Sequence, residues 1–203
     1  MPDGVTVVSA RAALRAATGE VHERLHAVPA FRDLAEGRVT RAEYAALLRR
    51  LLGFHAPLEA RLAAVPALDA FVDVDARRRA WLIREDLAAL DEPDAVGVLD
   101  LAPMEDAGFA MGCLYVTEGA TLGGLHLARA LDGVLPAGVE GRRFLLGHGA
   151  RHGEMWREFC AALEQCGAEP EQRARMVEGA VEAFGWFEGW VSNPGRVVLT
   201  KLA

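Results

Sequence analysis

The sequence predicts an all-α fold, a compact multi-helix domain, on three observations. Apolar residues recur at helical intervals along almost the whole 203-residue chain. Glycine and proline interrupt these periodic stretches where helices would end. A strong start signal opens the second stretch, in which Thr40 and Glu43 stand at the spacing of a capping box.

The first two predicted helices follow from these signals. The first runs from about Ser9 into the high twenties and ends at Pro29, with apolar residues at Leu14, Ala17, Val21 and Val28. The second begins after Thr40 and carries a stripe of leucines. Pro57 lies within it and is expected to bend it.

The remaining helices are separated by polar or glycine-containing connections. The acidic stretch 91–103 is the longest of these and is expected to be either a lid or a plain loop. The predicted helices cover residues 75–90, 104–131, 141–166 and a last stretch from Pro170 to about Asn193. Residues 197–202 are expected to form a short strand or a loose segment.

The composition suits a single domain over residues 1–203, with 52% hydrophobic and 25% charged residues. The net charge is −7 and both signs are mixed along the chain, which argues against a nucleic-acid partner. No stretch approaches the ~20 apolar residues of a membrane span. Cys113, Cys160 and Cys166 form no C-x-x-C pair and are expected to be buried thiols. The expected location is therefore cytoplasmic.

His22, Glu23 and His26 form an H-E-x-x-H pattern close to the amino terminus. In zinc peptidases two histidines one turn apart bind the metal and the glutamate is the general base. Such a site needs a third protein ligand, for which Glu43 and Glu59 stand at a workable distance in sequence. Neither lies in a recognisable motif. A di-iron site would need a second E-x-x-H pair, which the chain lacks.

The other histidines and the tryptophans are expected to be structural. His26 is expected to face solvent, and His55 to be a hydrogen-bonded histidine of the core. His126 follows the glycines described below and is assigned no role, and His148 and His152 are expected at the surface. The tryptophans are expected to pack in the core on apolar helical stripes: Trp81, Trp156, Trp186 and Trp190.

Gly119, Gly123 and Gly124 stand within six residues of an otherwise strong helix. Each costs ~1 kcal/mol there relative to alanine, so some feature requires the missing side chains. Gly119 and Gly123 are four residues apart and share one face, where the backbone can approach a flat or bulky object closely. Close packing against another helix is the alternative, and spacing alone favours it.

The glycine run and the first helix together resemble two motifs of the haem oxygenase family, in the same order. The stretch from Leu14 to His22 and the Gly37-Arg-Val-Thr-Arg connection resemble the family's proximal region. The run Gly119-Ala-Thr-Leu-Gly-Gly, preceded by Tyr115-Val-Thr-Glu, is similar to the distal helix of bacterial members. The resemblance covers most of the chain. It implies cleavage of haem to biliverdin, with dioxygen and electrons consumed and carbon monoxide and Fe(II) released.

The resemblance also implies roles for individual residues. His22 would be the axial ligand of the haem iron, the only metal expected. Gly119 and Gly123 would line the oxygen-binding face and, with Gly124, would contact the haem. Arg15 lies two helical turns before His22 on the same face and would meet a haem propionate. The implied electron donor is external, a ferredoxin or a flavoprotein reductase, since the chain shows no flavin or nicotinamide fingerprint.

One position departs from the family pattern. Many members carry an aspartate directly after the first distal glycine, where it orders waters that deliver protons, and this chain has Ala120 there. Thr121, Glu118 or waters held by the backbone are the candidates to replace it. The alternative function is therefore a haem carrier or sensor of the same fold that does not turn over. A third is an enzyme of this architecture that acts on another small molecule.

Overall fold

A computed structural model of the chain describes residues 9–192, and every regular element in that range is helical. The all-α prediction is therefore confirmed. The α-helices are α1 (Ala10–His26), α2 (Pro29–Ala35), α3 (Arg41–Ala63), α4 (Ala80–Ala89), α5 (Ala107–Ala130), α6 (Arg143–Leu146), α7 (His152–Cys166) and α8 (Pro170–Ser192). Short 3₁₀ turns lie at Pro66–Ala70, Asp75–Arg77, Leu131–Gly133 and Gly149–Arg151. The segment 197–202 lies outside the described residues.

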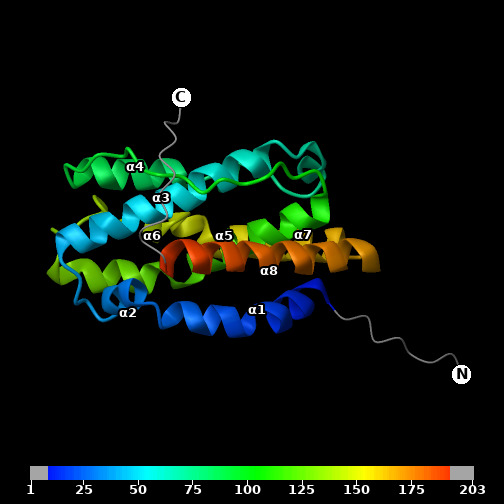
Figure 1. Ribbon diagram of the computed structural model, residues 1–203, viewed down its shortest axis with the longest axis horizontal. Coiled ribbons are helices and arrows are strands. Elements are labelled where there is room, and N and C mark those ends of the chain that lie inside the picture. The colour runs from blue at the N-terminus through cyan, green and yellow to red at the C-terminus, as the bar shows by residue number, and fades with distance from the viewer. Residues whose placement is uncertain (1–8, 193–203) are drawn as a thin grey trace, which may run out of the picture.

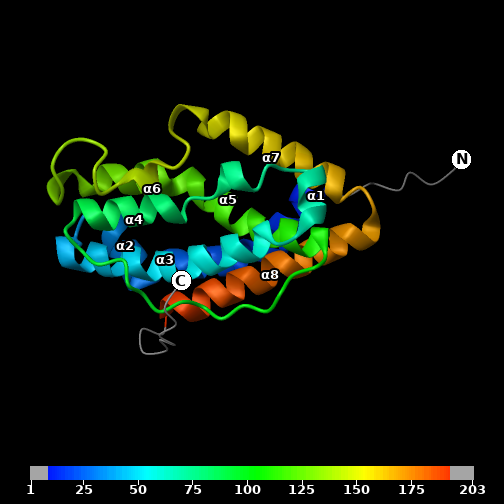
Figure 2. The same cartoon turned by 90° about the horizontal axis from the view of Figure 1, so that it is seen from above.

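Figure 1 shows α5 and α8 side by side in the middle of the molecule, with α3 and α4 on one side and α1 and α2 on the other. Turned by 90°, the same arrangement shows α6 and α7 along the remaining side of α5 (Figure 2). Within the described residues, no helix combines the length and apolarity that crossing a membrane requires.

The predicted helix starts are confirmed where side chains cap them. The Ser9 hydroxyl accepts from the Ala12 amide over 3.1 Å at the start of α1. At the start of α3 the Thr40 hydroxyl accepts from the Glu43 amide over 3.2 Å, and the Glu43 carboxylate accepts from the Thr40 amide over 2.8 Å. Helix α3 continues through Pro57. The sequence pattern does not predict α2, because Pro29 indicates only the end of the preceding helix, whereas in the structure it is the first residue of α2.

Two predicted helices are divided in the structure. The helix predicted over 141–166 is wrong as a single element, since Gly147 and Gly149 both have φ +56°, which no right-handed helix allows. They separate the short α6 from α7. The helix predicted over 75–90 begins only at Ala80, and Asp75–Arg77 forms a separate 3₁₀ turn.

Helices α5 and α8 touch through glycines along one seam. A Cβ atom at Gly112 would overlap the carbonyl oxygen of Met176, and one at Gly179 would overlap that of Phe109. The two backbones are therefore in contact, which only glycine permits at these positions. This seam fixes α5 on α8 and so sets the position of everything that α5 carries.

The long connection after α4 is packed against α3. The Leu99 amide donates to the Gly53 carbonyl over 2.9 Å, and a Cβ at Gly53 would overlap the carbonyl oxygen of Gly97. Leu101 and Met104 of this connection are buried in the core. Of the two predicted possibilities, a lid and a plain loop, these contacts favour the plain loop.

Candidate functional site

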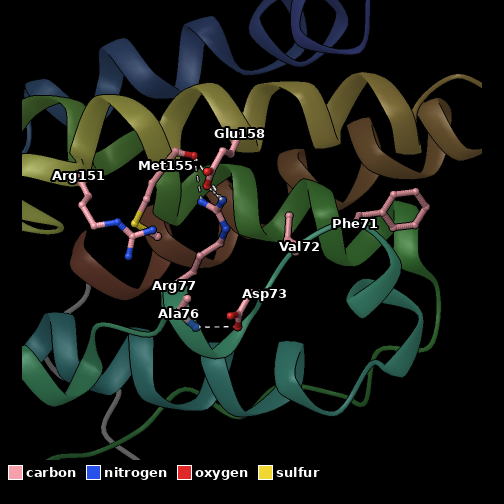
Figure 3. Close-up of a pocket in the computed structure, with 8 residues that line it drawn as sticks. All are labelled: Phe71, Val72, Asp73, Ala76, Arg77, Arg151, Met155 and Glu158. Atoms are coloured by element: carbon pink, nitrogen blue, oxygen red, sulfur yellow. Dashed lines mark hydrogen bonds and ion pairs between the residues drawn. The ribbon is translucent and has the colours of Figure 1, made fainter.

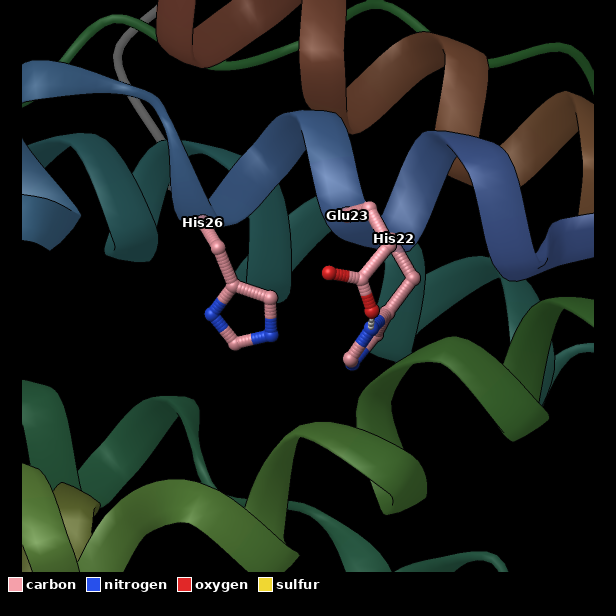
Figure 4. Close-up of side chains that lie close together, drawn as sticks. All are labelled: His22, Glu23 and His26. Atoms are coloured by element: carbon pink, nitrogen blue, oxygen red, sulfur yellow. Dashed lines mark ion pairs between the residues drawn. The ribbon is translucent and has the colours of Figure 1, made fainter.

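Three side chains of α1 point toward α5. Figure 4 shows His22, Glu23 and His26 leaving α1 on the side that faces the green helix α5. The side chain of His22 is 56% exposed, and its ring meets that of His26 edge-on with 4.7 Å between centroids. The His22 ring also stands edge-on to buried Phe184 of α8, with 6.5 Å between centroids. His22 is thus supported by the core and open toward α5.

Polar contacts at both ends hold α1 in place. Near its end, the Arg24 guanidinium donates twice to the Glu188 carboxylate of α8, over 2.7 and 2.9 Å. At its start, the Glu164 carboxylate of α7 accepts from the amides of Ala10 and Arg11 over 2.9 and 3.1 Å. A carboxylate there also suits the positive end of the helix dipole. These contacts fix where His22 stands relative to the central helices.

Within residues 9–192, no side chain covers Gly119 or Gly123 of α5. A Cβ atom at either position would meet no heavy atom of the described part of the chain within 4 Å. Leu122 lies on the same stripe, and it is 53% exposed although it is apolar. Packing against a helix, which the spacing alone favoured, therefore does not explain Gly119 and Gly123. The stripe is an uncovered apolar surface of the kind that marks a binding site.

Gly124 has a different neighbour. A Cβ atom there would overlap the carbonyl oxygen of Leu145, so this glycine permits close packing of α5 on α6. Its missing side chain faces α6, whereas those of Gly119 and Gly123 face open space. Gly124 therefore has a role in packing α5 on α6, which its spacing in the sequence does not indicate.

Arg15 is exposed on α1 and lies near Tyr115 of α5. Burial raises the pKa of Tyr115, while contact with Thr18 and the positive charges of Arg11 and Arg15 lower it. Tyr115 received no role from the sequence. It stands four residues before Gly119 and so shares the glycine face, a spacing that could have identified it.

Behind this face α5 carries a buried ion pair. The Arg77 guanidinium donates to the Glu118 carboxylate over 2.5 Å, and Glu118 is only 2% exposed. Arg79, also buried, donates to the Thr117 carbonyl over 2.6 Å. The Thr121 hydroxyl donates to the Glu118 carbonyl over 2.6 Å. Glu118 and Thr121, the two side chains that are candidates to replace the missing aspartate, therefore make their hydrogen bonds on the buried side of α5.

His148 completes this cluster, and its expected position at the surface is wrong. Its side chain is only 10% exposed, and its Nε2 lies 3.8 Å from Glu118 Oε1. Burial alone would raise the pKa of Glu118, but His148, Arg77 and Arg79 outweigh burial and lower it. Glu118 is therefore a carboxylate near neutral pH. Sequence spacing did not reveal this, because the turn at Gly147 and Gly149 brings His148 to α5.

A cavity of about 20 Å³ adjoins Ala120 on the α3 side of α5. This is roughly the room that one water needs. Its lining includes the polar residues His55 and Thr117 and the apolar Phe54, Val116 and Phe187. His55 is buried as expected, and its Nδ1 lies 3.8 Å from Glu59 Oε1 without a hydrogen-bond partner in the described part of the chain.

A larger cavity, of about 360 Å³, lies elsewhere. Figure 3 shows its lining residues around Arg77, between the segment that contains Phe71 and Asp73 and the start of α7. Charges of both signs line it, from Asp73, Glu158, Arg77 and Arg151. No residue of α1 or α5 is among its lining, so it is separate from the His22 face.

Several other expectations can be compared with the structure. Glu43 and Glu59, the candidate third zinc ligands, are used elsewhere, Glu43 in the capping box and Glu59 as acceptor from the amides of Arg79 and Ala80. Trp81 is 54% exposed, so its expected core position is wrong. The cysteines are free and buried, as expected: Cys113, Cys160 and Cys166.

The chain matches a known family over most of its length. The model of the family described as "Heme oxygenase" matches residues 8–193. A heme oxygenase of Xanthomonas campestris pv. campestris is 33% identical over 174 residues, which cover 80% of this chain and 97% of that protein.

Solved structures share the fold at lower identity. The heme oxygenase of Neisseria meningitidis, solved with NO and CO bound, has a TM-score of 0.76 and 23% identity, and the match covers 95% of this chain and 100% of that one. The heme oxygenase-1 of the cyanobacterium Synechocystis, solved in complex with heme, has a TM-score of 0.71 and 15% identity, with 91% of each chain covered.

Proposed function

The chain belongs to the haem oxygenase family, and from that premise we propose that haem binds between α1 and α5 with His22 as the axial ligand of its iron. The family's enzymes are oxidoreductases that open haem to biliverdin. The observation that carries the assignment is the pairing of an exposed histidine on α1 with the uncovered glycine face of α5. Bound haem supplies both the iron that activates dioxygen and the ring that is opened.

The residues present fit a flat apolar ring. Gly119 and Gly123 leave room for it beside the α5 backbone, and exposed Leu122 adds an apolar contact. A neutral imidazole nitrogen is a common axial ligand of haem iron. The ring of His22 stands edge-on to buried Phe184 of α8, so part of its surface lies against the core. Gly124 is not part of this proposed contact set.

Arg15 is the proposed partner of a haem propionate. It stands two helical turns before His22, about 10.5 Å along the helix axis, which matches the reach from the iron to the ring edge. Its guanidinium is exposed and suited to a carboxylate. Tyr115 lies beside it at the same end of the site.

Proton supply has to work without a carboxylate at position 120. The small cavity beside Ala120 has room for one water, and Thr117 and His55 are the polar groups on its wall. Burial lowers the pKa of His55, although Glu59 opposes that effect, so its imidazole is neutral near pH 7. His55 lines the cavity, and a neutral imidazole can exchange a proton with a water held there. His55 is therefore the proposed proton relay to the α5 face.

Electrons have to come from outside the chain. We assign this role to a ferredoxin or a flavoprotein reductase, because the chain carries no flavin or nicotinamide fingerprint. The three cysteines are buried and unbonded to one another, which supports a reducing compartment, and the cytoplasm is the proposed one.

Haemin titration followed by turnover tests the proposed function. One haemin per chain should give a saturable Soret band, and adding a reductant in air should convert that band to a biliverdin spectrum. Haem that stays intact under reductant would indicate a carrier or sensor. Absence of stoichiometric binding would contradict the site itself.

A further inference from the structure

Glu23 and His26 have no part in the proposed function, although both point the same way as His22 (Figure 4). The ligand atoms that these three residues offer all lie within 4.8 Å of one another. All three side chains are exposed, so an ion can reach them without displacing any protein group. Within residues 9–192, no other group of three or more His, Cys, Asp or Glu side chains gathers in this way.

Two imidazoles and one carboxylate form a ligand set that suits zinc and its neighbours in the first transition row. Metal–ligand bonds of 2.0–2.2 Å place neighbouring ligand atoms ~3 to 4 Å apart, so these side chains need to close by at most about 1 to 2 Å. His22 Nδ1 is already 3.7 Å from Glu23 Oε1. His22 and His26 are four residues apart and share one face of α1, which brings their rings together.

We propose that the haem-free protein binds one divalent transition-metal ion, of the zinc and cobalt class, through His22, Glu23 and His26. Three protein ligands leave at least one coordination position for water. The ion and haem exclude each other, because each needs the ring of His22. This exclusion rests on the proposed function, whereas the metal site itself depends only on the three side chains.

The exclusion has a measurable consequence for haem loading. An ion that binds only the haem-free form weakens the apparent affinity for haem by the factor 1 + [M]/Kd, with M the free ion. Free zinc at ten times its Kd should therefore weaken haem binding about elevenfold. The site would make the uptake of haem sensitive to free transition metal.

Titration of the haem-free full-length protein with Co²⁺, followed through its visible ligand-field bands, tests the metal site. Wild type should bind one ion per chain, and His26→Ala should bind it at least tenfold more weakly. Glu23→Gln should bind it more weakly than wild type. His126→Ala, which removes another exposed histidine, should match wild type and is the control. No saturable binding, or equal affinity in wild type and His26→Ala, would overturn the site.

A second titration separates this inference from the proposed function. Haemin is added to wild type and to His26→Ala, with and without Zn²⁺. Free Zn²⁺ at ten times its Kd for wild type should weaken haem binding by wild type about elevenfold and by His26→Ala at most about twofold, while both bind haem equally well without it. If haem and one Co²⁺ ion bind wild type together, the exclusion is wrong. If wild type binds Co²⁺ through His26 but no haem, the proposed function fails and the metal site stands.

Discussion

Arg77 donates to Glu118 over 2.5 Å, inside the protein and directly behind the first open glycine of α5. Arg77 also donates to the Met155 carbonyl of α7 over 3.3 Å, so one guanidinium joins α5 to α7. Glu118 is the residue before Gly119. The pair therefore fixes the segment of α5 on which the open face depends.

Arg77→Met should destabilise the protein strongly, because it removes the guanidinium that donates to the buried Glu118 carboxylate. Removing one partner of a buried ion pair costs about 3–5 kcal/mol. The double variant Arg77→Met with Glu118→Leu should recover part of that loss. Urea unfolding of the haem-free protein measures both. A loss below about 1 kcal/mol in the single variant would show that the pair does not hold α5.

The three distal glycines should respond differently to alanine. Gly124→Ala should unfold or strongly destabilise the protein, because its Cβ would overlap the Leu145 backbone. Gly119→Ala and Gly123→Ala should fold at least as stably as wild type, with a gain of up to ~1 kcal/mol each. Both should bind haem more weakly, since their methyl groups enter the proposed site. Thermal melts and haemin titrations of the three variants check this, and equal behaviour of all three would contradict the two assignments.

Asp86 should make stability depend on pH. It is fully buried and accepts from the amides of Arg143 and Phe144 over 2.8 and 2.9 Å, yet burial outweighs these bonds and raises its pKa to about 6. The folded protein thus holds this proton more tightly than the unfolded chain does. The stabilising contribution is complete below about pH 4 and is lost as the pH rises through about 6.

Comparison with Asp86→Asn, which cannot ionise, isolates this effect. The stability of wild type relative to the variant should fall by at most ~3 kcal/mol between pH 4 and pH 7, and stay level above that. Urea unfolding at steps of pH measures it. A difference that stays constant or rises over this range would contradict the raised pKa.

His55→Leu should slow turnover and leave haem binding unchanged. Loss of a positioned proton donor typically costs at least 100-fold in rate. The decay of the Soret band under reductant, in H₂O and in D₂O, measures it, and the solvent isotope effect should increase in the variant. His126→Leu is the matched control and should behave as wild type. An unchanged rate and isotope effect in His55→Leu would remove His55 from the proton route.

Local signals made the fold predictable and left most long-range contacts unpredicted. Thr40 and Glu43 cap α3 through neighbours in sequence, so their pattern was sufficient. The break at Gly147 depends on a positive φ, which composition does not specify. Gly124 is packed against α6 and Gly119 has no close neighbour among the described residues, and no spacing within α5 contains that information. His148 reaches Glu118 through the same break, across 30 residues of sequence.

The most direct test of the central claim is the visible spectrum of His22→Ala loaded with haemin, before and after adding imidazole. If His22 is the axial ligand, the variant should lose the wild-type Soret position and its turnover, and free imidazole should restore both by entering the space that the side chain left. A variant that keeps the wild-type spectrum without imidazole would show that another residue holds the iron, and the site between α1 and α5 would have to be reassigned.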